Sequence, residues 1–222
     1  MNKEHALKPV KQNTIFVDCF QTVILRKLST KQVLKLWAEN LEDKLKIDWK
    51  EFYKTYNKIN FKLSFKKLIT KFVLEEKFEV VLLKVYEKLS RKYKNLNAED
   101  FVAAAIECYI QAEKVSHYIN ENFISFLRNE KAKGKKIFIV SDFYCSKEIL
   151  TKWLVNLGVA DIFENIFSSY DFDKEKATTK LYKHLLKDLN LKAKDVVMFG
   201  DNVWSDVLMS RLCGLHARRI KY

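Results

Sequence analysis

The four glycines of this 222-residue chain all follow residue 133, and its one proline is Pro9. Glycine and proline supply many of the tight turns of small β-proteins, so their scarcity argues against an all-β sandwich and against low-complexity classes. No glycine or proline interrupts residues 29–133. That stretch is therefore predicted to be helical with short polar connections, in a chain long enough to bury a substantial core.

Local capping patterns support helices in the glycine-free stretch. Ser29 with Gln32 has the pattern of a capping box, and Asp48 with Glu51 marks the start of a second helix. Asn97, which precedes two acidic residues, is expected to cap a long last helix. We interpret the aromatic stripes of this region as the core of a helix bundle. Further segments with helical periodicity run near residues 61–76 and 78–93.

After residue 133, short apolar runs alternate with helical patterns. One helix is expected over residues 177–189. Such runs suit strands buried on both faces, and the alternation predicts a parallel sheet with right-handed crossovers. We expect an α/β fold with a parallel, Rossmann-like sheet flanked by helices, formed by residues 1–26 and 131–222. An all-helical cap of residues 27–130 would be inserted after the first strand. The expected strands are residues 14–18 (TIFVD), 136–141 (KIFIVS), 165–168 (NIFS), 195–199 (DVVMF) and an edge strand near 215–220.

Polar residues follow several of these expected strands. Asp18, Ser141 and Asp201 each stand at a strand end, and Asp206 lies five residues after Asp201. Ligands of open parallel sheets bind at the carboxyl ends of the strands, so these side chains are expected to converge. Carboxylates suit a hard cation such as Mg²⁺, which a substrate phosphate often completes, and a serine and a lysine can hold the remaining phosphate oxygens.

Four motifs in this order resemble the haloacid dehalogenase-like (HAD) hydrolases, most of which are Mg²⁺-dependent phosphatases. The first motif is most similar to a subgroup with the pattern FD-x-FDTL-x-x-R that often accompanies polysaccharide-assembly enzymes. The resemblance covers about residues 14–220. Its motifs are FVDCFQTVILR (16–26), KIFIVSDFY (136–144), a lysine in SSYDFDKEKATTKLY (168–182) and VVMFGDNVWSD (196–206).

The resemblance implies a phosphohydrolase in which Asp18 is the nucleophile and forms an aspartyl-phosphate that water then hydrolyses. Asp18, Asp201 and the backbone carbonyl of Phe20 would hold Mg²⁺, and Asp206 would support the metal site or orient the lysine. The catalytic group would be completed by Ser141 and Lys176, which would also bind the substrate phosphate together with Thr22 and Asn202.

The motif lysine is assigned by its spacing. In the family it precedes a leucine–aromatic pair by five residues, and Leu181–Tyr182 then selects Lys176. Lys174 and Lys180 stay open as alternatives.

The first motif departs from the usual pattern at the general acid. Most phosphatases of the family carry an aspartate two residues after the nucleophile, and the resembling subgroup carries one a residue later. Here these positions are Phe20 and Gln21, and phenylalanine cannot transfer a proton. Three interpretations follow. The chain is a phosphohydrolase that is slow, prefers good leaving groups or takes its acid from elsewhere, either from Asp142 or from a residue of the cap. Alternatively, it is a degenerate domain that binds phosphate and Mg²⁺ or serves as an interaction module, or it is a metal-independent dehalogenase.

Composition limits the other partners. The net charge is +13, but lysine makes up most of the 41 basic residues and no block of about five or more like charges occurs, so no specific nucleic-acid partner is expected. No apolar run is long enough to span a membrane, and the scattered cysteines favour a cytoplasmic protein without a zinc site. The expected substrate is a small phosphorylated metabolite, for which the resemblance suggests a sugar phosphate. The oligomeric state stays open.

Overall fold

The protein divides into two compact units. A computed structural model describes residues 7–70 and 77–221, with only the backbone for 64–70. The first unit, here called the α/β unit, joins the chain up to Leu25 with the segment from Ile119 onward. The second, here called the helical unit, is Arg26–Tyr118. The sequence-based boundary at residue 130 differs from this division by one helix, α5, which packs into the core of the α/β unit.

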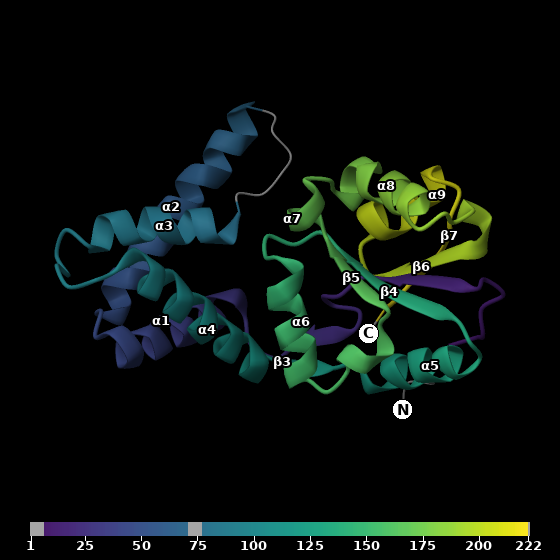
Figure 1. Ribbon diagram of the computed structural model, residues 1–222, viewed down its shortest axis with the longest axis horizontal. Coiled ribbons are helices and arrows are strands. Elements are labelled where there is room, and N and C mark those ends of the chain that lie inside the picture. The colour runs from purple at the N-terminus through teal and green to yellow at the C-terminus, as the bar shows by residue number, and fades with distance from the viewer. Residues whose placement is uncertain (1–6, 71–76, 222) are drawn as a thin grey trace. The chain divides into compact units, whose positions relative to one another are not determined.

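The α/β unit is built on a five-stranded sheet in the order β5-β4-β1-β6-β7 (Figure 1). Every neighbouring pair is parallel, with Val17 opposite Ile139 on one side and opposite Phe199 on the other. The predicted parallel sheet is therefore confirmed, and the expected edge strand does lie at an edge. The strands are β1 (Thr14–Val17), β4 (Lys136–Ser141), β5 (Asn165–Ser168), β6 (Val196–Gly200) and β7 (His216–Arg219).

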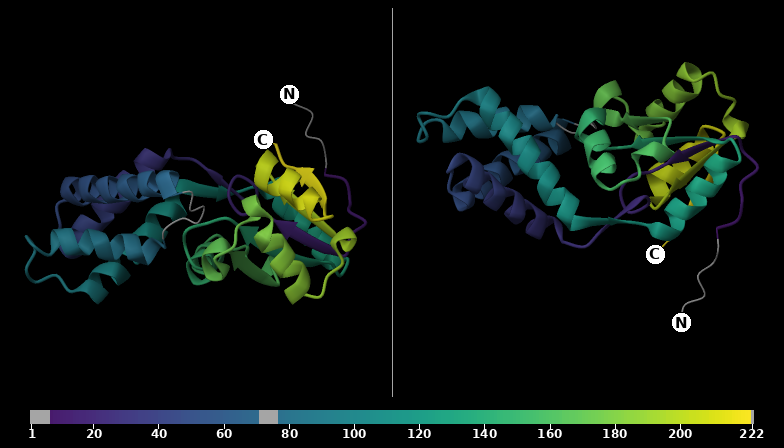
Figure 2. Two further views of the ribbon diagram at one scale, coloured as in Figure 1. Left: turned by 90° about the horizontal axis from the view of Figure 1, so that it is seen from above. Right: turned by 60° about the horizontal axis from the view of Figure 1, so that its bottom comes forward.

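Successive side chains of a strand point to opposite faces of the sheet, and in β1 the side chains on both faces are buried. Ile15 and Val17 of β1 belong to one hydrophobic cluster, and Phe16 between them belongs to another. The first cluster includes residues of α5 and α6, and the second includes residues of α8 and α9, so helices cover both faces (Figure 2). The helices of this unit are α5 (Glu121–Ala132), α6 (Lys147–Asn156), α7 (Ser169–Phe172), α8 (Lys180–Asp188) and α9 (Met209–Leu212).

One predicted helix of the α/β unit is broken in the structure. A single helix was expected over residues 177–189, but a 3-10 turn, Lys176–Thr178, precedes α8. Thr179 between them has a φ of 65°, a left-handed conformation that cannot continue a right-handed helix. The prediction was wrong here because apolar periodicity does not report a single left-handed residue.

The helical unit contains α1 (Thr30–Leu45), α2 (Trp49–Thr70), α3 (Phe78–Leu89) and α4 (Ala98–Ser116). Trp37 is fully buried, and its ring lies 4.9 Å from that of Phe52, 5.7 Å from Phe78 and 5.4 Å from Tyr109. These four residues come from α1, α2, α3 and α4 in turn. The indole nitrogen donates to the carbonyl of Ala105 at 2.8 Å, so the polar atom is satisfied as well. The interpretation of the aromatic stripes as bundle core is confirmed.

The local helix signals are confirmed in the same unit. Ser29 and Gln32 form the predicted capping box, and the Asn97 side chain caps α4. Asp48 accepts from the amide of Glu51 at 2.8 Å. The helix predicted near residues 61–76 is instead the end of α2, and its positions 71–76 lie outside the described residues.

The chain crosses between the units twice, in two short strands that the sequence did not predict. These are β2 (Ile24–Arg26) and β3 (His117–Ile119), which pair with each other. Among the described residues, no helix is both long and apolar enough to cross a membrane.

Candidate active site

The candidate site lies at the carboxyl ends of three adjacent strands. Asp18 follows β1, Ser141 ends β4 and Asp201 follows β6. Because β1 lies between β4 and β6, the sheet order places these residues side by side, as the strand-end argument predicts. The amide of Asp18 donates to the carbonyl of Phe199 at 2.8 Å, which extends the β1–β6 ladder to the aspartate itself.

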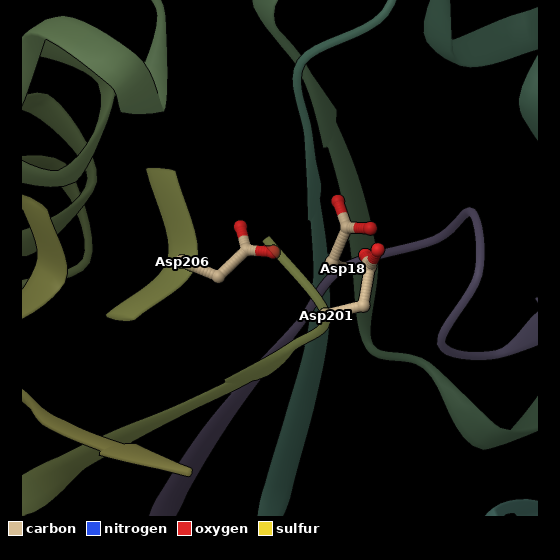
Figure 3. Close-up of side chains that lie close together, drawn as sticks. All are labelled: Asp18, Asp201 and Asp206. Atoms are coloured by element: carbon tan, nitrogen blue, oxygen red, sulfur yellow. The ribbon is translucent and has the colours of Figure 1, made fainter. Parts of the chain in front are cut away.

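Three carboxylates meet at this edge. Oxygens of Asp18, Asp201 and Asp206 all lie within 4.8 Å of one another, and the side chains converge from the three segments that carry them (Figure 3). Asp18 and Asp206 are buried, whereas Asp201 is half-buried. The structure thus brings together the three aspartates that were assigned to the metal site from the sequence.

Lys176 lies among these carboxylates. Its ammonium nitrogen is 2.6 Å from Oδ1 of Asp18 and 2.7 Å from Oδ1 of Asp206, and the residue is 1% exposed. The two alternative lysines lie elsewhere: Lys174 Nζ donates to the carbonyl of Phe172, and Lys180 is exposed. Three carboxylates against one ammonium leave an excess of negative charge, which a divalent cation would offset.

The titration behaviour of the site reflects this crowding. The pKa of Asp18 is raised to about 7, chiefly by burial; Asp206 and Asp201 add to the rise, and Lys176 opposes it. Burial and Asp206 also raise the pKa of Asp201. Burial acts to lower the pKa of Lys176, but Asp18 and Asp206 outweigh it and hold this pKa well above its ordinary value. Lys176 is therefore a stable cation in this site.

Asp206 is held by its surroundings as well as by Lys176. Its Oδ2 accepts from the amide of Asn202 at 3.1 Å, and its Oδ1 accepts from the hydroxyl of Ser205 at 3.2 Å. The side-chain oxygen of Asn202 accepts from the amides of Trp204 and Ser205, which begin a helical turn. The structure thus gives Asn202 a capping contact, and its predicted contact with substrate stays a prediction.

Two buried hydroxyls, one at this edge and one in the turn that follows Asp18, have no hydrogen-bond partner within the described part of the chain. They belong to Ser141, 1% exposed, and Thr22, 0% exposed. An unpaired buried hydroxyl is costly, and a bound phosphate could satisfy it. Both residues were predicted to bind phosphate, and the acidic cluster together with these hydroxyls fits a site for Mg²⁺ and a phosphoryl group.

The positions of the missing general acid are occupied by groups that cannot replace it. The Phe20 ring packs 4.4 Å from Phe143 and 5.1 Å from Trp153. Gln21 has a φ of 53°, in a tight turn in which its amide donates to the carbonyl of Ile24. The Phe20 carbonyl as a metal ligand stays a prediction.

Asp142 and Trp204 have contacts that the sequence did not indicate. Asp142 accepts from the amides of Lys176 and Ala177, and the indole of Trp204 donates to the carbonyl of Ala177 at 3.2 Å. Both contacts join segments far apart in the chain, so no local pattern reports them.

The fold is shared with solved structures of hydrolases. The chain is similar to a magnesium-bound structure of YfnB, described as a HAD-hydrolase, from Bacillus subtilis: 17% identity, a TM-score of 0.56, and 93% of this chain and 85% of the other covered. It is also similar to a 2-haloacid dehalogenase from Pseudomonas syringae: 14% identity, a TM-score of 0.63, and 93% and 85% covered. At these identities the likeness establishes the fold alone.

A curated relative is the glyceraldehyde 3-phosphate phosphatase of Methanocaldococcus jannaschii, which is 30% identical over 99 residues. That match spans 44% of this chain and 42% of the relative, so the chain matches less than half of that protein's length.

A family model also covers most of the chain. The model of the haloacid dehalogenase-like hydrolases matches residues 12–214, a range that includes all four motifs and the acidic cluster. By this match the chain belongs to the haloacid dehalogenase-like hydrolases.

Proposed function

We propose that this hydrolase is a Mg²⁺-dependent phosphatase that acts on a small phosphorylated metabolite through an aspartyl-phosphate on Asp18. The observation that carries the proposal is the Lys176 ammonium between Asp18 and Asp206, with Asp201 within the same cluster. This arrangement offers an acidic cation site and a fixed positive charge beside one nucleophilic carboxylate. A sugar phosphate is the favoured substrate class, since the curated relative is a phosphatase of glyceraldehyde 3-phosphate.

The residues present suggest how the reaction would run. Asp18 attacks phosphorus, so a bond forms from its carboxylate oxygen while the bond to the leaving oxygen breaks; water then hydrolyses the aspartyl-phosphate and regenerates Asp18. Ser141, Thr22 and Lys176 would hold the phosphoryl oxygens. Mg²⁺, held by the three aspartates and the Phe20 carbonyl, would lower the negative charge that the nucleophile meets.

Proton supply distinguishes this site from that of most phosphatases in the family. Phe20 has no titratable group, and both oxygens of Asp142 accept from backbone amides. In the α/β unit the leaving oxygen would therefore take its proton from water. A slower reaction with poor leaving groups follows, because general acid catalysis contributes roughly 10²–10⁴-fold to such reactions.

The direct test is phosphate release from a panel that includes an aryl phosphate and glyceraldehyde 3-phosphate, with and without Mg²⁺. We expect Mg²⁺-dependent release that Asp18→Asn abolishes and that Asp188→Asn leaves intact, since Asp188 is an exposed aspartate at the end of α8. Release that survives Asp18→Asn would contradict the assignment of the nucleophile.

The second candidate is a degenerate domain that binds phosphate and Mg²⁺ without turnover. The packing of Phe20 against Phe143 and Trp153 favours it, because an aromatic cluster stands where the acid would act. Mg²⁺ binding without release from any member of the panel would support it. Halide release from a 2-haloacid in the absence of metal would instead identify a dehalogenase. The cytoplasmic location stays a prediction beside these candidates.

A further inference from the structure

Asp142 stands next to the site but outside the group of carboxylates that meet there. It directly follows Ser141 at the end of β4, whereas the clustered acidic oxygens belong to Asp18, Asp201 and Asp206. Its Oδ1 accepts from the amide of Lys176 at 2.8 Å, and its Oδ2 accepts from the amide of Ala177 at 3.2 Å. One carboxylate thus holds two successive backbone amides.

These two amides begin the 3-10 turn Lys176–Thr178. The first amides of a helical turn have no partner within the turn, and a side-chain oxygen just before the turn usually accepts from them. Here the preceding residue, Glu175, makes no such capping bond. Asp142, which lies 34 residues before Lys176 in the chain, supplies the acceptors instead.

The same turn is held on its other side. The indole of Trp204 donates to the carbonyl of Ala177 at 3.2 Å, so Ala177 is bonded through both its amide and its carbonyl. Lysine has a long side chain with several rotatable bonds, so the placement of its ammonium depends on a fixed backbone. With the backbone held, Lys176 Nζ lies at 2.6 and 2.7 Å from two aspartates.

We propose that Asp142 is a positioning residue that ties the backbone of Lys176 to the end of β4. Adjacent residues of one strand end would then place both phosphate-binding groups, Ser141 through its own hydroxyl and Asp142 through Lys176. The catalytic consequence rests on the proposed phosphatase function; the structural tie does not. This role also assigns a function to Asp142, the acidic residue that directly follows Ser141 in the second motif.

The structural arm of the test is amide hydrogen exchange in the metal-free protein. In Asp142→Ala we expect the amides of Lys176 and Ala177 to exchange about tenfold faster or more, while those of β4 keep their protection. The matched control is Asp171→Ala, because the exposed Asp171 accepts from the amide of Lys147 at 3.1 Å in the same unit. Unchanged exchange at Lys176 and Ala177 would overturn the tie.

The functional arm is a double-mutant cycle with Lys176→Ala. Asp142→Ala is expected to lower kcat/KM about tenfold and to weaken competitive inhibition by inorganic phosphate, whereas in the Lys176→Ala background it should change neither. If Asp142→Ala lowered kcat/KM by the same factor in both backgrounds, as a general loss of stability would, the positioning role would be overturned. Asp142→Asn, which retains one acceptor oxygen, should fall between the wild type and Asp142→Ala, and serves if the alanine variant does not fold. If the wild type turns over no phosphate ester, the phosphatase proposal fails, while the exchange measurement still decides the tie.

Discussion

The backbone of Gly200 lies against the carboxylate of Asp206, where a β-carbon at position 200 would stand only 2.2 Å from Oδ2 of Asp206. No side chain fits in that space unless Asp206 moves. Gly200 is the last residue of β6 and precedes Asp201. Because Gly200 has no side chain, Asp206 can pack against its backbone and still contact Lys176.

Gly200→Ala is therefore expected to displace Asp206 and to lower kcat/KM by about a hundredfold or more, because Lys176 would lose one of its two carboxylate partners. The matched change is Gly134→Ala, where φ is +81° and nothing lies within 4 Å of the new β-carbon. That variant should lose about 1–2 kcal/mol of unfolding free energy from backbone strain and keep its activity. Steady-state kinetics and urea unfolding of both variants separate the loss of activity from the loss of stability. If Gly200→Ala were as active as Gly134→Ala, the predicted displacement of Asp206 would be refuted.

The choice among the three candidate lysines can be tested one residue at a time. Lys176→Ala should lower kcat/KM by about 10²–10³-fold, since the only described ammonium placed between Asp18 and Asp206 would be lost. Lys174→Ala and Lys180→Ala should stay within about threefold of the wild type, because their side chains lie away from the carboxylates. A large loss in either of the latter variants would reassign the motif lysine.

Restoring an acid at position 20 should change the substrate preference. In Phe20→Asp we expect kcat for an alkyl phosphate to rise about ten- to a hundredfold, with little change for an aryl phosphate, whose leaving group needs no proton. The isosteric control is Phe20→Asn, which removes the same packing against Phe143 and Trp153 without adding an acid. The prediction fails if both variants change the ratio of alkyl to aryl turnover equally.

Glu130 should make the stability of the α/β unit sensitive to acid. It is 1% exposed and lies 2.5 Å from Lys133 and 3.0 Å from Lys135, and it accepts from the amide of Val10. Burial acts to raise its pKa, but the bonds from Lys133, Lys135 and Val10 hold it below the ordinary value of 4.5. A lowered pKa in the folded state stabilises the protein above about pH 4.5, and this contribution is lost as the pH falls through the lowered pKa.

Glu130→Gln should therefore lower the free energy of unfolding at pH 7 by about 1–3 kcal/mol and reduce its dependence on pH below 4.5. Urea unfolding monitored between pH 3 and 7 measures both effects. Identical pH profiles for the wild type and the variant would show that Glu130 does not contribute. Glu164→Gln is the control, since Glu164 pairs with Lys131 at the surface at 3.6 Å and should change stability little.

The elements of this protein could be read from the sequence where their signals are local. The apolar run of residues 137–140 predicts a strand because a strand buried on both faces is mostly apolar. Ser29 with Gln32 predicts a helix start because its bonds span only three residues. The strand-end residues Asp18, Ser141 and Asp201 could be expected to converge, because parallel strands end at one edge. The general acid's absence at Phe20 was equally visible.

Packing alone settled the rest. The contact of Lys176 with Asp18 joins residues 158 positions apart, and the tie from Asp142 to the Lys176 turn spans 34. Thr179 interrupts an otherwise regular helical pattern with a left-handed backbone, and the turn before it is bonded to the distant residues Asp142 and Trp204. Sequence periodicity describes which face of an element is buried, whereas the atoms that meet at the site depend on how segments distant in the chain fold against one another.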